Sequence, residues 1–474
     1  MLDNLEKPFI HLFSLSDEFY MYDVNTNKIV CISKEVYDYL NEEADCLTNE
    51  VYDIISSLKK QGFLLTNRMK RIEHPFTEKV EYYLQSKLQM LSLQVTQNCN
   101  LRCDYCAYSG NYTNRSHQNI NMSFDSAKKA VDFFIDRSGE TNQLGIGFYG
   151  GEPLLQFSLI KKTVSYILEN YPEREYVFTI TTNGTVMPPE AIAFLDNHNF
   201  GVMISLDGYK ENHDKNRKFN SNGVGSFDTI IKNLKIIKDK YSKLYKNLTF
   251  SVVLDADSDF SKCNEFFINN EFVKDSILSV ASVSNNYIKE EKENTSNRLE
   301  LERYELFKYL LVKMNRLKIG SYSKLIWQYD SQLEKFCAEM AKPSDTVPEN
   351  GHHSGPCIPG AHRLFVNVNG DFFPCEKVSE CSEVCGIGNI ENGFDIEKVK
   401  SILNIGKLTE DECKNCWAYR YCMLCLVHSD GMDKLSSKKK LSYCDNVRNS
   451  AEEKMKEYCF LKKMNSDKYE EVAR

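Results

Sequence analysis

Short apolar runs alternate with amphipathic stretches at helical spacing between about residues 85 and 320. Runs of four to eight apolar residues are typical of buried strands, and apolar positions three or four apart are typical of helices. The strands predicted in this way are 91–96, 144–149, 176–182, 201–206, 248–254 and 276–283. The predicted helices lie near 123–137, 156–170, 188–198, 226–240, 260–270 and 299–317. Six strand–helix units predict an α/β fold with a parallel sheet.

The first 75 residues have a different pattern. Two β-prone runs, 19–23 and 28–32, flank a segment rich in turn formers and predict a hairpin. Two helices are predicted next, one around Val36–Leu40 and one from Thr48 to Gly62, and Phe63–Leu65 is read as a returning strand. This order is winged-helix-like. Asp and Glu outnumber Lys and Arg here, which argues against DNA binding.

Composition narrows the class of protein. The 474 residues predict two to four domains, and a net charge of −8 without a basic patch makes nucleic acid an unsuitable partner. Neither a signal peptide nor an apolar run of about eighteen residues is recognisable, so we expect a cytoplasmic protein without a membrane partner. Seventeen cysteines in a reducing compartment point to metal or redox chemistry.

Three of these cysteines, Cys99, Cys103 and Cys106, form a C-x3-C-x2-C loop directly after the first predicted barrel strand. Three thiolates can bind three irons of a [4Fe–4S] cluster and leave the fourth iron without a protein ligand. A zinc ion would need a fourth ligand close by, and His117 is the candidate.

Polar motifs follow the next predicted strands, where ligands collect at the carboxyl ends of parallel strands. Gly150-Gly151-Glu152 ends the second strand: its glycines allow close approach to a ligand, and Glu152 can accept hydrogen bonds from an ammonium group. Asn183 comes at the end of the third strand and Ser205 at the end of the fourth. Arg217 comes next, and its planar fork suits a carboxylate. Ordinary glycine turns and a surface salt bridge are the structural alternatives.

A second group of cysteines lies beyond a Pro- and Gly-containing boundary at 342–351. Its members are Cys357, Cys375, Cys413, Cys416, Cys422, Cys425 and Cys444. Paired C-x2-C motifs are also compatible with a zinc ribbon.

The cysteine loop, with Tyr105 before its third cysteine and the Gly-Gly-Glu motif after it, resembles the radical S-adenosylmethionine (SAM) enzymes. The resemblance implies a partial (β/α)6 TIM-like barrel over 85–340. In that family the open iron binds the amino and carboxylate groups of SAM, and reduction yields a 5′-deoxyadenosyl radical. The SAM-pocket residues that it implies here are Tyr105, Gly150, Gly151, Glu152, Asn183, Ser205 and Arg217.

The later cysteines resemble the SPASM domain, here 350–450, which carries two auxiliary [4Fe–4S] clusters and would bring the total to three. The cluster nearer the active site would take Cys357, Cys375 and Cys425; the distal one would take Cys413, Cys416, Cys422 and Cys444. One gap departs from the usual spacing, with two residues before Cys425 where three are usual. The near cluster is one ligand short, because Gly351 stands where sulfatase-maturing relatives have a cysteine. Its iron is open or takes one of Cys337, Cys381, Cys385, His352 and His353. Residues 451–474 are expected to form a helical tail.

Residues 1–75 resemble, in pattern, the element that captures a precursor's leader peptide as an added strand; a packing cap is the alternative. The whole chain thus resembles maturases that install sactipeptide- or ranthipeptide-type thioethers in ribosomally made peptides, with flavodoxin or ferredoxin as reductant. Glu376 follows Cys375, at the position where sulfatase-maturing relatives carry a catalytic Asp, and is a candidate base. The alternatives are an anaerobic sulfatase-maturing, formylglycine-generating enzyme and a non-enzymatic iron–sulfur electron carrier or redox sensor.

Overall fold

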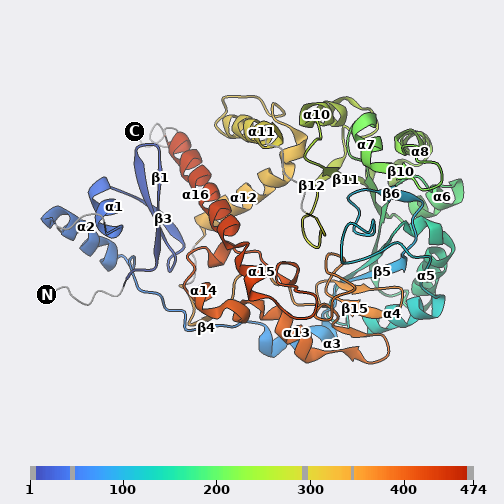
Figure 1. Ribbon diagram of the computed structural model, residues 1–474, viewed down its shortest axis with the longest axis horizontal. Helices are drawn as coiled ribbons and strands as arrows, with labels where there is room; N and C mark the ends of the chain where they lie inside the picture. Colours follow the sequence, from blue (N-terminus) through green and yellow to red (C-terminus); the bar gives the residue numbers. More distant parts are fainter. Residues whose placement is uncertain (1–6, 43–47, 291–296, 343–345, 467–474) are drawn as a thin grey trace.

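The structure, a computed structural model, describes residues 7–42, 48–290, 297–342 and 346–466. Its main sheet begins with six parallel strands in the order β12-β11-β9-β8-β7-β5 (Figure 1). Their bounds are β5 Met90–Thr96, β7 Gln143–Gly150, β8 Glu175–Thr182, β9 Gly201–Ser205, β11 Leu248–Leu254 and β12 Ile277–Ser282. These are the six strands predicted from the sequence, displaced by at most one residue at either end.

Helices connect the strands and cover the outer face of the sheet (Figure 1). The helices are α4 Phe124–Asp136, α5 Phe157–Asn170, α6 Pro189–Asn197, α8 Phe227–Lys240, α10 Phe260–Asn269, α11 Asn297–Lys313 and α12 Trp327–Ala341, with the short α7 Lys210–Asn216 and α9 Ser242–Lys246 between them. Helix α4 shows why they form: Ser123 caps its first turn, and Ala127, Val131 and Phe134 bury one face at helical spacing. The predicted α/β barrel is confirmed.

The cysteine-rich region continues the barrel sheet. Strand β14 (Leu364–Val366) pairs in parallel with β5, and β15 (Asp371–Phe373), β16 (Gly388–Asn389) and β17 (Gly393–Phe394) extend the sheet in antiparallel order. All three residues of β14 are buried. Helices complete this part of the chain: α13 Ile396–Leu403, α14 Glu410–Lys414, α15 Ser437–Leu441 and α16 Cys444–Ser466. The strand that begins this region therefore lies directly beside the strand that leads into the cysteine loop.

The N-terminal part forms a three-stranded antiparallel sheet, β1 (Ile10–Leu15), β2 (Glu18–Asp23) and β3 (Lys28–Ile32), followed by α1 (Lys34–Leu40) and α2 (Asn49–Lys60). The predicted hairpin and helices are present. The returning strand expected at Phe63–Leu65 is wrong, because Leu64 adopts a positive φ of 60° and β1 supplies the third strand. Helix α16 packs against β1 (Figure 1), where the His11 ring stacks on Trp417 with centroids 3.6 Å apart.

Two small strand pairs tie distant segments together. Strand β4 (Arg71–Ile72) pairs with β13 (Asn350–Gly351), and β6 (Leu101–Cys103) pairs with β10 (Arg217–Phe219). The short helix α3 (Val80–Ser86) leads from β4 into the barrel. Among the described residues, no helix is both long and apolar enough to cross a bilayer.

Candidate functional site

The cysteine loop is enclosed at the carboxyl end of β5. Cys99 and Cys103 are buried and Cys106 is half-buried, and the three pack with Leu101, Tyr105 and Phe219 in one cluster. The pKa of Cys99 is raised to about 12, chiefly by burial and also by the charges of Glu152, Cys103 and Cys106. The three cysteines therefore lie close enough together for their charges to interact. A bound cation would reverse these shifts by stabilising the thiolates.

Glu152 lies at the base of this site with its side chain fully buried. Its Oε1 accepts hydrogen bonds from Thr182 Oγ1 (2.7 Å) and the Leu154 backbone N–H (3.0 Å), and its Oε2 accepts one from the Asn183 N–H (2.7 Å). Burial raises the pKa of Glu152 to about 7, while these hydrogen bonds act in the opposite direction. Glu152 is thus a buried carboxyl poised between its neutral and ionised forms near neutral pH.

The two glycines before Glu152 fit closely against the segment that leads into the cysteine loop. A Cβ on Gly150 would lie 2.2 Å from the Thr96 carbonyl oxygen, and one on Gly151 would lie 2.3 Å from that of Asn98. Gly150 also has a φ of 146°, which favours glycine. The sequence-based interpretation assigned these glycines to close approach by a ligand; in the structure the close neighbour is the protein's own backbone.

Asn183 follows the third strand and Ser205 ends the fourth, as predicted, and among the described residues Asn183 contacts the loop. Its Nδ2 lies 3.7 Å from Cys99 Sγ and donates to Asn100 Oδ1 at 2.8 Å. Ser205 is the last residue of β9 and pairs with Ser251 of β11. Asn183 therefore connects the third strand to the first cysteine.

Arg217 is fully enclosed beside the loop, and its partner is Asp207, which the sequence analysis missed. Arg217 Nε donates to Asp207 Oδ2 at 2.7 Å, and Tyr105 Oη donates to the same oxygen. His213 accepts a hydrogen bond from the Asp207 N–H at 3.3 Å. In the sequence, Asp207 could have been noticed as a charged residue that directly follows an apolar strand. The surface salt bridge considered for Arg217 is wrong, because the pair is buried.

The structure brings together Cys357, Cys375 and Cys425, the three residues expected at the near auxiliary cluster. Burial raises the pKa of Cys375 to about 11, and the charges of Glu376, Cys357 and Cys425 contribute. Burial likewise raises the pKa of Cys357, and the nearby Cys425 acts in the same direction. The unusual gap before Cys425 thus does not remove it from this group.

The four residues expected at the distal cluster also form one group. Burial raises the pKa of Cys422 to about 12, with further contributions from Cys413 and Cys416. Cys413 and Cys444 likewise help to raise the pKa of Cys416. These cysteines come from α14, the following loop and the start of α16, so tertiary structure rather than sequence proximity assembles the set.

The candidates for a fourth near-cluster ligand are scattered. Cys337 lies on α12, Cys381 is exposed, and Cys385 is buried with its Sγ 3.1 Å from Asp430 Oδ2. Both ring nitrogens of His352 have partners, the His353 carbonyl and the Gly406 N–H, each at 2.8 Å. His353 is 2 % exposed, and its Nε2 has no hydrogen-bond partner among the described residues. Cys385 and His352 are thus engaged elsewhere.

A buried ion pair between Arg115 and Glu380 links the cysteine-loop segment to the cysteine-rich region. Arg115 Nε lies 2.5 Å from Glu380 Oε1, and Gln94 Nε2 donates to the same oxygen at 2.6 Å. Burial raises the pKa of Tyr149, which lies between this pair, Glu376 and Cys106. The interior between the first cysteine loop and the near group is therefore polar and charged.

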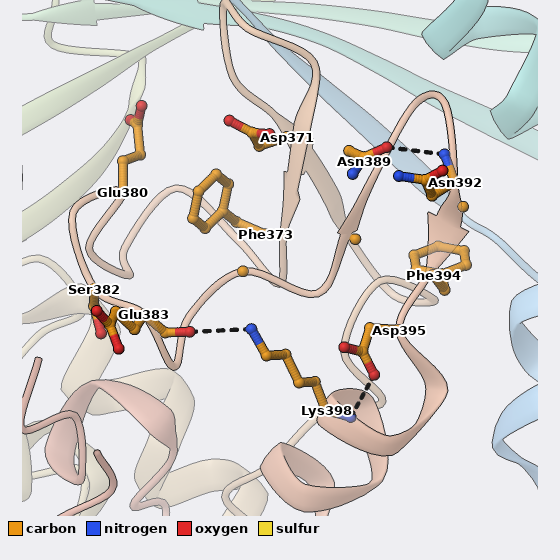
Figure 2. Close-up of a pocket in the computed structure, with 13 residues that line it drawn as sticks. Asp371, Phe373, Glu380, Ser382, Glu383, Asn389, Asn392, Phe394, Asp395 and Lys398 are labelled. Carbon is orange, nitrogen blue, oxygen red and sulfur yellow. Dashed lines mark hydrogen bonds between the residues drawn. The ribbon is translucent and has the colours of Figure 1, made fainter. Parts of the chain in front are cut away.

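A separate cavity of about 420 Å³ lies at β15–β17 (Figure 2). Asp371, Glu380, Glu383 and Asp395 give it an acidic wall, and the Lys398 ammonium donates to the Glu383 carbonyl at 3.1 Å. None of the site residues predicted from the sequence is among the residues that line it. Glu380 belongs to both regions, since its carboxylate turns to Arg115.

The donor sets fit iron–sulfur clusters better than single ions. Within the described ranges, no three His, Cys, Asp or Glu side chains converge closely enough to hold one metal ion. Zinc draws its ligands to about 2.0–2.3 Å from a single centre. A cubane instead binds each thiolate to a separate iron, so buried thiols that do not meet at one point suit it.

Comparison with known proteins gives the family. A model of the radical SAM superfamily matches residues 93–260. An uncharacterized protein of Methanocaldococcus jannaschii, MJ0907, is 30% identical over 318 residues, which cover 66% of this chain and 93% of that protein. A cysteine-type anaerobic sulfatase-maturating enzyme of Clostridium novyi is 33% identical over 187 residues, 39% of this chain and 49% of that enzyme, so this match spans about half of it. The chain belongs to the radical SAM superfamily.

The solved structure of native anSMEcpe with bound AdoMet and a Kp18Cys peptide has a similar fold. It superposes with a TM-score of 0.54 at 22% identity and covers 77% of this chain and 99% of that one. The barrel and its C-terminal extension therefore form a fold with a known counterpart.

Proposed function

We propose that this protein is a radical SAM maturase that joins a cysteine sulfur to another residue of a ribosomally made precursor peptide through a thioether. We assign residues 1–75 to precursor recognition, 85–340 to the radical SAM core, 350–450 to a SPASM domain and 451–474 to a helical tail. The proposal rests above all on three separate groups of thiols, one at a barrel strand end and two in the C-terminal region.

Each group of site residues would have a separate role in the proposed reaction. Cys99, Cys103 and Cys106 would hold the first [4Fe–4S] cluster, which with bound SAM supplies a 5′-deoxyadenosyl radical on reduction. Glu152 would accept hydrogen bonds from the SAM amino group at the base of the site. Cys357, Cys375 and Cys425, and the four cysteines of the distal group, would hold the auxiliary clusters. The substrate thiol must lose its proton as the carbon–sulfur bond forms, and we assign that proton to Glu376. The one electron left over when the carbon radical joins the sulfur would pass to an auxiliary cluster.

The N-terminal sheet would recruit the precursor. In the described part of the chain β3 pairs only with β2, which leaves its outer edge available for an added strand, while α16 packs on β1. Main-chain hydrogen bonds along such an edge give affinity with little demand on side chains. The leader would therefore bind along Lys28–Ile32.

Similarity to sulfatase-maturating enzymes favours one second candidate, formylglycine generation. The two functions separate in one assay. Purified enzyme, SAM and a chemical reductant are incubated with a cysteine-rich precursor encoded nearby or with a sulfatase-derived peptide. A thioether product has lost one hydrogen from carbon and one from sulfur, whereas formylglycine is an aldehyde that hydrazide reagents trap. Aldehyde formation without cross-linking would overturn the thioether proposal.

Two controls complete this test. The precursor without its leader should be modified far more slowly; this is preferable to deleting residues 1–75, which would uncover Trp417 on its His11 face. Replacing Cys99, Cys103 and Cys106 together by Ala should abolish 5′-deoxyadenosine formation while iron remains at the C-terminal sites. Deoxyadenosine formation by the wild type excludes a mere electron carrier, and its persistence in the triple variant would refute the assignment.

A further inference from the structure

Lys440 on α15 is a buried lysine among the distal cysteines. Lys440 is 1 % exposed. The Nζ donates to Thr409 Oγ1 at 2.6 Å and to Cys413 Sγ at 3.1 Å. It also opposes the burial effects that raise the pKa of Cys422 and of Cys444. The ammonium group therefore lies inside the four-cysteine group and not merely at its rim.

Among the described residues, this ammonium group has no carboxylate partner. Among the described residues its hydrogen-bond acceptors are one hydroxyl and one sulfur, and no Asp or Glu lies within ion-pair distance. The other titratable side chains that it affects, His352 and His353, have pKa values lowered by burial and are neutral. A buried charge without an opposite charge is strongly unfavourable. The electron-rich atom that its Nζ contacts in the interior is the Cys413 sulfur, 3.1 Å away.

Arg448 on α16 offers a natural contrast. Its charge also affects Cys416 and Cys444. However, its side chain is 39% exposed and is paired with Asp445, 2.6 Å away. Solvent and this carboxylate screen the guanidinium, whereas nothing comparable screens Lys440. Two cations thus flank the four-cysteine group and both affect Cys444, but only Lys440 acts from a low-dielectric interior.

We propose that Lys440 is a positioning residue that sets the reduction potential of the distal auxiliary cluster by holding a fixed positive charge beside Cys413. The inference rests on the proposed assignment of Cys413, Cys416, Cys422 and Cys444 to that cluster. One-electron reduction adds a negative charge to a group that already carries four thiolates. A buried ammonium stabilises the reduced state more than the oxidised state, and so makes the cluster easier to reduce.

The test compares Lys440→Met, which removes the charge; Lys440→Gln, which retains a hydrogen-bond donor; and Lys440→Arg, which retains the charge. All are made in the full chain carrying Cys99, Cys103 and Cys106 replaced by Ala, so that only auxiliary clusters contribute. The clusters are assembled anaerobically, iron is counted, and potentials are measured by redox titration with dithionite and mediators, followed by electron paramagnetic resonance. The near cluster serves as an internal reference, and Arg448→Gln is the matched control.

We expect the Met and Gln variants to shift the distal reduction equilibrium at least tenfold towards the oxidised form, which is about 59 mV for one electron. Lys440→Arg and Arg448→Gln should change the potential of the distal cluster by less than half of that amount. The potential of the near cluster should not change in any variant. Unchanged potentials in iron-replete Met and Gln variants would overturn the role of Lys440. So would loss of the cluster in both neutral variants with its retention in the Arg variant, which would indicate a purely structural role. A wrong assignment of the cysteines to the distal cluster would give a different result. In that case, replacing Cys413 and Cys422 by Ala would leave the iron content unchanged.

Discussion

The Arg217 guanidinium and the Asp207 carboxylate form a buried ion pair that fastens the cysteine loop to the end of the fourth barrel strand. Arg217 lies opposite Cys103 in the small β6–β10 pair, and Asp207 follows β9. The two side chains are 8% and 1% exposed. Because Tyr105 donates to the same carboxylate, one acidic residue orients both an arginine and a tyrosine that flank the cysteines.

Replacing Asp207 by Asn should therefore destabilise the protein strongly. The substitution leaves the Arg217 charge buried without an opposite charge, and breaking buried pairs in this way costs about 3–5 kcal/mol. Urea denaturation of the metal-free protein measures the change. Asp228→Asn is the matched control, because Asp228 pairs with Lys210 at an exposed site where the two side chains are 72% and 49% exposed; we expect less than about 1 kcal/mol there. Equal losses in the two variants would contradict this view of the pair.

Gly151 should not tolerate a side chain. An alanine Cβ would lie 2.3 Å from the Asn98 carbonyl oxygen and 2.6 Å from its carbon, so the segment before Cys99 would have to move. Overpacking of this kind typically costs about 1–3 kcal/mol. We expect Gly151→Ala to lose iron at the first cluster after anaerobic reconstitution, while the C-terminal sites fill normally.

Gly139→Ala provides the comparison for this prediction. A Cβ at Gly139 meets no atom within 4 Å, so the variant should retain all its iron and be unchanged or up to about 1 kcal/mol more stable. If Gly151→Ala bound as much iron as Gly139→Ala, the close fit of the two backbones would not matter for cluster assembly.

Glu152 should make SAM binding dependent on pH. Its pKa is raised to about 7 by burial, so the side chain is mainly neutral at pH 6 and mainly ionised at pH 8. The ionised form accepts hydrogen bonds from an ammonium group more strongly. The ratio of wild-type to Glu152→Gln affinity should therefore rise about tenfold between pH 6 and pH 8. Equilibrium dialysis with the cluster-loaded enzyme measures this ratio, which also cancels titration of SAM itself. A ratio that stays flat over this range would argue against contact between Glu152 and the amino group.

The sequence pattern predicted the barrel well, and the reasons for the misses are physical. Strands such as β7 and β11 are long enough for their own residue pattern to identify them as strands. Strand β14 has three residues, and its place depends on pairing with β5, which periodicity cannot reveal. Strand β1 carries His11 and Ser14 among its apolar residues, so its pattern is weak. The local sequence of a short strand does not reveal which distant strand it pairs with.

The candidate site divides in the same way. The resemblance to the SPASM domain anticipated which of the later thiols lie near one another, even for Cys425 with its unusual gap. The charged partners were missed, because Asp207 and Lys440 become significant only through burial next to residues distant in the chain. Single charged residues in an apolar context are the signal for such partners, but the sequence does not reveal which of them fold inward.

Glu376 directly follows Cys375 and faces the near cysteine group. Its partner is not the adjacent Lys377 but Arg363, whose Nη1 forms an ion pair with Glu376 Oε1. Its other carboxylate oxygen, Oε2, is buried and has no hydrogen-bond partner among the described residues. One oxygen is thus held in place, while the other is buried without a hydrogen-bond partner among the described residues, beside the near cysteine group.

Glu376→Gln should slow cross-linking without removing cofactors. The amide keeps the size and polarity of the side chain but cannot take the proton that a substrate thiol must lose, and with an ordinary cysteine pKa of about 8.5 only a few per cent is thiolate at pH 7. We expect both auxiliary clusters and peptide-dependent 5′-deoxyadenosine formation to persist, with product formed at least about tenfold more slowly, a barrier change near 1.4 kcal/mol. The defect should shrink as the pH rises from 6 to 9, because solvent then deprotonates more of the thiol. Arg363→Gln disturbs the same ion pair but leaves the carboxylate, so it should retain more activity than Glu376→Gln. Mass spectrometry of the product over time measures both variants, and product formation at the wild-type rate across this pH range would leave Glu376 without a role in proton transfer.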